Sequence, residues 1–130
     1  MSRTVVLVDA VRTPFGKAGG MYAGTRADDL MVRAIRGLLE RNPKIDPASI
    51  EDVAIAAATQ TGDQGMNIGR SAALLSGLPN TVPGYSVDRW CAGALTAVTT
   101  IQLMTPTMTS IKPLKPTFMF ICVHTIHTKN

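Results

Sequence analysis

The chain has 130 residues, of which 45% are hydrophobic and 17% charged, which is the composition of a globular domain and excludes a disordered segment. The net charge of +4 is uneven: residues 1–100 hold ten Lys and Arg against nine Asp and Glu, and residues 101–130 hold three Lys and no acid. Because no aromatic side chains interleave with the basic ones in that tail, we expect no nucleic-acid binding.

The cysteines and the apolar runs predict a cytoplasmic protein. Cys91 and Cys122 lack the paired spacing of a disulfide framework or a zinc site. Asp9 interrupts the apolar residues 5–8 too early for a signal peptide, and residues 118–123 are too few to span a bilayer. We therefore expect a reducing compartment, no membrane association and no bound metal.

The first half of the chain predicts a strand, a helix and a second strand. Residues 5–8 (Val-Val-Leu-Val) are a continuous apolar run, typical of a strand buried on both faces. After the turn formers of residues 12–20, Thr25 and Asp28 have the spacing of a capping box at a helix start.

The apolar face of this first helix consists of Ala27, Leu30, Met31, Ala34, Ile35 and Leu38. The helix is expected to end at Asn42, before Pro43. Since residues 53–58 predict the second strand, the three elements form a βαβ unit, and the fold class is α/β with a parallel sheet.

The chain up to residue 100 continues with a second helix, a third strand and a third helix. The polar residues 60–67 lead to a helix over residues 68–75, closed by Gly77 and Pro79. Residues 82–90 predict a strand and residues 91–100 a helix made of small apolar residues without a clear polar face. A helix of that kind belongs inside a larger structure, so the chain is expected to be part of something bigger.

Cys91 is the strongest candidate for a functional residue, because it joins the third strand to the start of the third helix. The unpaired N–H groups and partial positive charge of a helix N-terminus favour a thiolate, which is the nucleophilic form of cysteine. A buried structural cysteine is the alternative for any lone thiol. Arg89 has two interpretations: its positive charge beside Cys91 favours the thiolate, or strand alternation directs it into a salt bridge.

Three segments together resemble the thiolase family, in order and spacing, over residues 4–100. They are residues 12–16 (Arg-Thr-Pro-Phe-Gly), residues 64–70 (Gln-Gly-Met-Asn-Ile-Gly-Arg) and residues 86–98 around Cys91. Bacterial 3-ketoacyl-CoA thiolases are the members that the chain resembles most. The resemblance implies a layered α/β/α/β/α fold, with the reactive helix between two sheets, of which residues 1–100 supply the first part of the N-terminal half.

The same resemblance implies that Cys91 is the catalytic nucleophile. Its thiolate attacks the 3-keto carbonyl of a 3-ketoacyl-CoA, the carbon–carbon bond breaks to release acetyl-CoA, and the acyl group passes to a second CoA. Coenzyme A is then a co-substrate and no cofactor is bound. Backbone N–H groups at the helix start are candidate donors to the carbonyl oxygen. Fatty-acid β-oxidation and homo-oligomeric assembly are implied, and biosynthetic acetoacetyl-CoA formation stays as an alternative.

The chain departs from the family pattern in ways that bear on its activity. Residues 91–94 are Cys-Ala-Gly-Ala where the family has Cys-x-Ser-Gly, and Asp88 stands where Asn is common. Motifs for the CoA-binding loop domain, the activating histidine, the Asn-containing oxyanion site and the second catalytic cysteine do not occur, and Cys122, His124 and His127 do not match them. We therefore expect the 130-residue chain by itself to be an inactive, truncated fragment.

Residues 101–130 differ in character from the rest, because they contain neither glycine nor acid and carry prolines at 106, 113 and 116. These prolines exclude a long helix. Residues 118–123 can form a strand, although no crossover helix precedes them within the tail. Our hypothesis is a divergent, unrelated or out-of-frame segment.

Two other segments have competing interpretations. Residues 12–20 lack the spacing of a P-loop or a dinucleotide-binding loop, so a structural turn is favoured over a phosphate site. Residues 64–70 are expected to support a subunit interface in preference to capping an active site.

Overall fold

The computed structural model describes residues 7–104 and 117–122, with side chains described up to residue 101. The helices are α1 (Ala27–Arg41), α2 (Ile68–Leu75) and α3 (Gly93–Met104), and the strands are β1 (Ile50–Ala56), β2 (Gly84–Val87) and β3 (Thr117–Cys122). The short 3-10 turns are η1 (Pro47–Ser49), η2 (Gly62–Gln64) and η3 (Trp90–Ala92).

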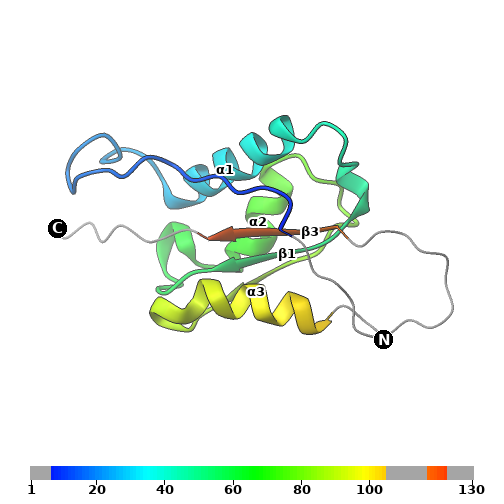
Figure 1. Cartoon of the computed structure of the whole chain (residues 1–130). Helices are drawn as coiled ribbons and strands as arrows, with labels where there is room; N and C mark the ends of the chain where they lie inside the picture. The colour runs from blue at the N-terminus through cyan, green and yellow to red at the C-terminus, as the bar shows by residue number, and fades with distance from the viewer. Residues whose placement is uncertain (1–6, 105–116, 123–130) are drawn as a thin grey trace, which may run out of the picture.

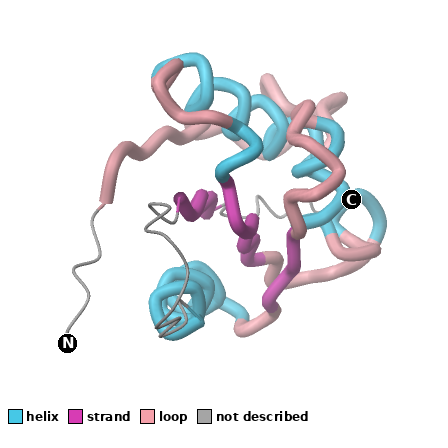
Figure 2. Tube along the Cα trace, turned by 90° about the vertical axis from the view of Figure 1, so that its right-hand side faces the viewer, coloured by secondary structure: helices cyan, strands magenta, loops and turns pink. Residues whose placement is uncertain are grey.

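The three strands form a parallel sheet in the order β2-β1-β3, which confirms the predicted α/β fold class. Helices α1 and α2 lie on one face of the sheet and α3 on the other (Figures 1 and 2). Both connections, β1-α2-β2 and β2-α3-β3, join parallel strands through a helix, as parallel pairing requires. The described residues thus form helix, sheet and helix layers.

Most of the buried core lies between the sheet and the α1–α2 layer. Val53 and Ile55 of β1 are fully buried there with Met31 and Ile35 of α1. Ala54, the strand residue between them, points to the opposite face and packs with α3. This alternation is the period of two expected for a strand, and it explains why β1 is apolar on both faces.

Several predictions from the sequence are confirmed with small shifts. Helix α2 has the predicted bounds, Ile68–Leu75, and Gly77 follows its C-cap Ser76 with a φ of +91°, which suits a residue without a Cβ. Strand β1 begins three residues before the predicted 53–58 and β2 is shorter than 82–90. The crossover helix missing from the tail is supplied by α3, which ends at Met104, two residues before Pro106.

The prediction of a strand at residues 5–8 is wrong for residues 7 and 8, the two of these residues that the structure describes. Residues 5 and 6 lie outside the described residues, while Leu7 and Val8 have irregular backbone and are 78% and 69% exposed. The pairing with β1 that a βαβ unit requires cannot form, because β2 and β3 occupy both edges of β1.

Asp9 instead holds this segment to the end of α1. Its carboxylate oxygens lie 2.9 Å from the Arg41 guanidinium and 2.8 Å from the Asn42 amide nitrogen. The hydrogen bond from the Asn42 amide is the main reason that the pKa of Asp9 lies below its usual value, with the Ala10 N–H and Arg41 adding to the effect.

The capping box predicted at Thr25 and Asp28 is also wrong. The N-cap residue of α1 is Arg26, whose side chain makes no capping bond, and Asp28 forms an ion pair with Arg26 at 2.7 Å. The N–H of Ala27 is satisfied by Asp63, whose Oδ2 accepts it at 2.6 Å. A cap supplied from 36 positions away cannot be found from local spacing.

Candidate active site

The turn between β2 and α3 places Cys91 at the carboxyl end of the parallel sheet. β2 ends at Val87, which pairs with Ala56 at the end of β1, and the chain then turns through η3 into α3. Cys91 is the middle residue of η3 and is exposed. In open parallel sheets, ligands bind beyond the carboxyl ends of the strands, so the thiol has the position of a functional group. The described residues do not bury the thiol.

Hydrogen bonds fasten the backbone on both sides of Cys91. The Asp88 carboxylate accepts the Trp90 N–H at 3.2 Å. On the other side, the Arg89 guanidinium donates to the Thr96 hydroxyl at 3.1 Å, and that hydroxyl donates to the Ala92 carbonyl at 2.9 Å. Arg89 therefore ties the turn to the first turns of α3, and this contact is with a hydroxyl, not with the carboxylate of a salt bridge.

Gly93 lets α3 begin close to the sheet. A Cβ at this position would lie 3.1 Å from the Cβ of Ala56 on β1. Small residues on both elements therefore bring the helix start, and with it Cys91, near the ends of the strands. This contact gives a physical reason for the glycine two residues after the cysteine.

Two of the candidate carbonyl-oxygen donors at the helix start are already used. The Ala92 N–H donates to the Arg89 carbonyl at 3.0 Å, and the Gly93 N–H donates to the Trp90 carbonyl. Both N–H groups therefore have partners within the turn. A donor to the substrate carbonyl oxygen at the helix start would have to be another N–H group.

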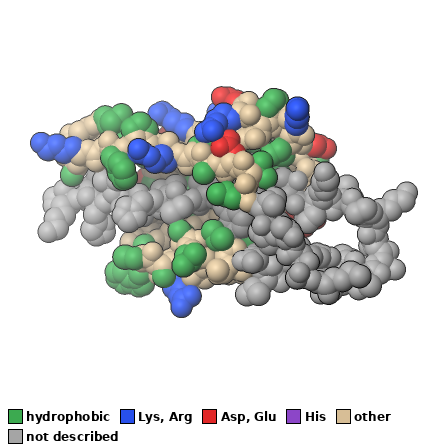
Figure 3. All heavy atoms as spheres, in the orientation of Figure 1, with side chains coloured by type: hydrophobic (Ala, Val, Ile, Leu, Met, Phe, Trp, Pro, Cys, Tyr) green, Lys and Arg blue, Asp and Glu red, His purple; other side chains and the backbone are tan. Residues whose placement is uncertain are grey.

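Several apolar side chains are exposed at Trp90 and along α3. Trp90 is 79% exposed, Leu95 68% and Val98 40%, whereas Ala97 and Ile101 of the same helix are buried against the sheet. Figure 3 shows hydrophobic side chains at the surface of the layer that α3 forms. The helix therefore packs with one face and leaves the opposite, also apolar, face uncovered by the described residues.

Comparison with known proteins identifies the family to which this arrangement belongs. The model of the thiolase N-terminal domain matches residues 5–108. The chain belongs to the thiolase family. The match includes β1, β2, the turn that carries Cys91 and all of α3.

Relatives of this thiolase-family chain differ in the acyl group in their names. The chain is 46% identical over 100 residues to a beta-ketoadipyl-CoA thiolase of Pseudomonas knackmussii, and the match covers 77% of the chain and 25% of the relative. It is 46% identical over 94 residues to a 3-ketoacyl-CoA thiolase of Pseudoalteromonas translucida, covering 72% and 24%. A 3-ketoacyl-CoA thiolase of Stutzerimonas stutzeri is 48% identical over 99 residues, covering 75% and 25%. The chain thus spans about a quarter of the length of these relatives.

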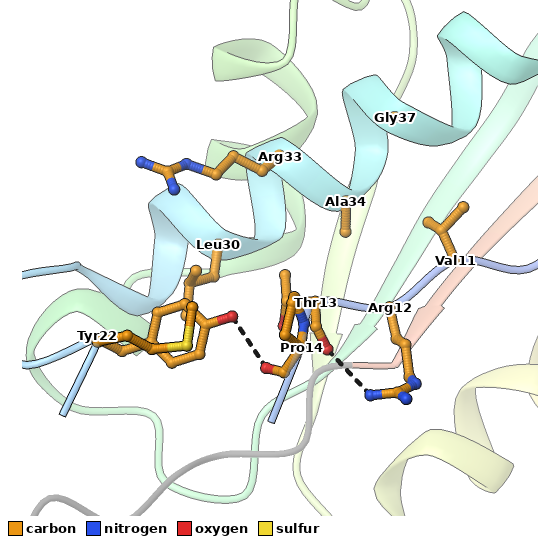
Figure 4. A pocket seen from close by; sticks show the side chains of 10 residues that line it. Val11, Arg12, Thr13, Pro14, Tyr22, Leu30, Arg33, Ala34 and Gly37 are labelled. Atoms are coloured by element: carbon orange, nitrogen blue, oxygen red, sulfur yellow. Dashed lines mark hydrogen bonds between the residues drawn. The ribbon is translucent and has the colours of Figure 1, made fainter. Parts of the chain in front are cut away.

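The thiolase-like residues 12–16 form a turn beside α1. A cavity of about 370 Å³ lies between this turn, Tyr22 and α1. The Tyr22 hydroxyl donates to the Pro14 carbonyl at 2.9 Å, and the side chains of Arg12 and Arg33 point in different directions (Figure 4). Since the two cations do not converge, the arrangement favours the structural turn over a phosphate site.

The thiolase-like residues 64–70 connect the start of α2 to β2 through hydrogen bonds. The Asn67 side chain accepts the Arg70 N–H and donates to the Gly84 carbonyl at 3.1 Å, while the Ser86 hydroxyl accepts the Gly69 N–H at 3.0 Å. Met66 before them is 95% exposed. The interface interpretation stays a prediction, because these contacts are all within one chain.

The remaining candidate residues from the sequence add no second site to the described structure. Within the part of the chain that the structure describes, no group of His, Cys, Asp and Glu can hold a metal ion and no helix is long and apolar enough to cross a membrane. The Cys122 side chain, His124 and His127 lie outside what the structure describes.

Sequence reasoning missed the left-handed backbone of Trp90, with φ of +47°. No residue-type signal predicts it, because glycine and asparagine, not tryptophan, favour that conformation.

Proposed function

We propose that this chain is the N-terminal part of an acyl-CoA acyltransferase in which Cys91 is the nucleophile. The observation that carries the proposal is an exposed thiol in the turn before α3, at the carboxyl end of the sheet, in a member of the thiolase family. The substrate class is a 3-ketoacyl-CoA, as in the names of the 3-ketoacyl-CoA relatives, and coenzyme A is the co-substrate. A role in β-oxidation, in the cytoplasm and as a homo-oligomer, belongs to the same proposal.

The first step joins the Cys91 thiolate to the substrate carbonyl and also needs a proton donor for the enolate that leaves. The Cys91 sulfur attacks the 3-keto carbon, the bond to the α-carbon breaks, and the departing enolate of acetyl-CoA takes up a proton. The thioester on Cys91 is then attacked by the thiolate of coenzyme A, which releases the shortened acyl-CoA and restores Cys91. A thiol suits this reaction because the acyl-enzyme is itself a thioester.

The described residues do not supply every group that the complete reaction needs. The described residues place no histidine beside Cys91 to activate the thiol and no second cysteine thiol to protonate the enolate. We therefore expect the isolated chain to accept acyl groups slowly on Cys91 and to show negligible thiolysis. A non-catalytic fragment is the competing function, and a biosynthetic acetoacetyl-CoA thiolase is the alternative that uses the same cysteine.

The test is the reaction of the chain with acetyl-CoA, followed by tandem mass spectrometry. Acetylation at Cys91 that disappears in Cys91→Ala and persists in Cys122→Ser is the expected result. Acetylation that favours Cys122, or that matches the rate of the unfolded chain, contradicts a nucleophilic role for Cys91. Acetyl-CoA formation from a 3-ketoacyl-CoA and coenzyme A well above the Cys91→Ala control overturns the expected lack of thiolysis.

A further inference from the structure

Trp90, the residue before the cysteine, has a backbone conformation that its type rarely adopts. Its φ of +47° lies in the left-handed region, which is energetically unfavourable for a residue that carries a Cβ. The side chain is 79% exposed, so packing by the described residues does not offset this cost. Strain of this kind concentrates at functional sites, where the surrounding structure maintains it.

The contacts that maintain the conformation come from both flanks of the turn. On the strand side, the Asp88 carboxylate accepts the Trp90 N–H at 3.2 Å, and on the helix side the Trp90 carbonyl accepts the Gly93 N–H. Both peptide groups of Trp90 are thus fixed. Because Gly93 is seated against Ala56, the helix-side anchor is in turn fixed to β1.

We propose that the left-handed turn at Trp90, held by Asp88, is the device that positions Cys91 for attack. The inference rests on the proposed function. The φ angle of Trp90 sets the orientation of the peptide that leads into Cys91, and therefore the direction of its Cα–Cβ bond. A relaxation of Trp90 to negative φ would turn the thiol away from its present approach to solvent. Asp88 and Trp90 act through Cys91 and are positioning residues, not catalytic ones.

The proposal predicts a specific pattern in two pairs of variants, made in a Cys122→Ser background so that Cys91 is the only thiol. Asp88→Asn keeps an oxygen that accepts the Trp90 N–H, whereas Asp88→Ala removes it. Trp90→Gly accepts a positive φ without cost, whereas the β-branched residue in Trp90→Val opposes it. The Asn and Gly variants should therefore behave like the parent, and the Ala and Val variants should not.

The first measurement is the rate of Cys91 alkylation by iodoacetamide in the folded protein, divided by the rate in denaturant. We expect Asp88→Ala and Trp90→Val to lower this ratio about tenfold, in line with the cost of misplacing a reacting group, and their partners to change it less than about twofold. Thermal melting by circular dichroism identifies any variant that fails to fold, and Trp90→Ala replaces Trp90→Val in that case. Equal ratios in all folded variants overturn the proposal, as does a loss in Trp90→Gly equal to that in Trp90→Val.

The second measurement is the rate at which acetyl-CoA acetylates Cys91 in the same variants, and it separates this inference from the function on which it rests. Transfer of an acetyl group from acetyl-CoA breaks the carbon–sulfur bond to coenzyme A, forms a thioester on Cys91 and releases the CoA thiol. If the alkylation pattern holds while no variant is acetylated, the positioning inference stands and the proposed function fails. If all variants are acetylated at the same rate, the proposed function stands and the inference fails.

Discussion

Among the side chains that the structure describes, the two faces of the sheet are packed very differently. On the α1–α2 face, thirteen described residues form one buried cluster that includes Met31, Ile35 and Ile55. On the α3 face, the buried cluster among the described residues is limited to Ala54, Ala97 and Ile101. The first face has two helices, and long side chains of α1 fill most of the space, whereas the second has one helix whose start is seated close to the strands.

This difference bears directly on the candidate site. Cys91 lies at the start of the helix on the thinly packed face, so its position depends on the turn after β2 and on Gly93, and less on a large core. The helix also presents Leu95 and Val98 to solvent, on the side away from the sheet. The described residues of α3 therefore leave an apolar surface of the kind that a larger assembly would cover.

The largest effect is expected where the well-packed face depends on close backbone contact. A Cβ at Gly69 would lie 2.1 Å from the Tyr85 carbonyl oxygen, so Gly69→Ala must displace α2 from β2. We expect a loss of about 3 kcal/mol or more in the free energy of unfolding, measured by urea denaturation.

The matched control for that substitution is Gly37→Ala in α1, where an added Cβ meets no atom within 4 Å. It should stabilise the protein by about 0.5–1 kcal/mol, because alanine is the better helix former. Equal effects at the two glycines would contradict the backbone contact between α2 and β2.

An effect of comparable size should distinguish the two faces when one side chain is truncated on each. Ile55→Ala removes a fully buried side chain from the α1–α2 face and should cost about 2–5 kcal/mol. Leu95→Ala removes a side chain that is 68% exposed on α3 and should change the stability by less than about 0.5 kcal/mol. Chemical denaturation of both variants gives the comparison, and a larger cost for Leu95→Ala would show that the outer face of α3 is already covered.

The smallest effect concerns a polar group on the α3 face. The Tyr85 hydroxyl is buried without a hydrogen-bond partner in the described residues. Tyr85→Phe removes the cost of that unpaired group and should stabilise the protein by about 1 kcal/mol near neutral pH, measured by thermal melting. A destabilised Phe variant would indicate that the hydroxyl has a partner.

Tyr85 also predicts a dependence on alkaline pH. Burial, with a further contribution from the Asp52 charge, raises the pKa of Tyr85 above its usual value. Above about pH 10 the unfolded chain releases this proton more readily than the folded protein, so the stability of the wild type should fall with rising pH. In Tyr85→Phe the stability should fall less steeply above about pH 10 than in the wild type. If the stability of the two proteins depends on pH in the same way, the raised pKa of Tyr85 is contradicted.

The sequence by itself determined the elements whose signal is local or periodic. The bounds of α2 follow from Asn67 before it and Gly77 after it, and the strand at β1 follows from a run of buried apolar residues. Three segments together, residues 12–16, 64–70 and 86–98, indicated the family by resemblance. The β-prone run before Cys91 and the small apolar residues after it placed the thiol between a strand and a helix.

Tertiary structure decided the features that depend on distant contacts. The cap on α1 comes from Asp63, and the expected strand at residues 5–8 is not formed by Leu7 and Val8 because β3 pairs with the available edge of β1. The left-handed backbone of Trp90 is maintained by Asp88 and by a helix seated on the sheet. In each case residues far apart in the chain, or a conformation that the residue type disfavours, are stabilised by neighbours that only the folded arrangement brings together.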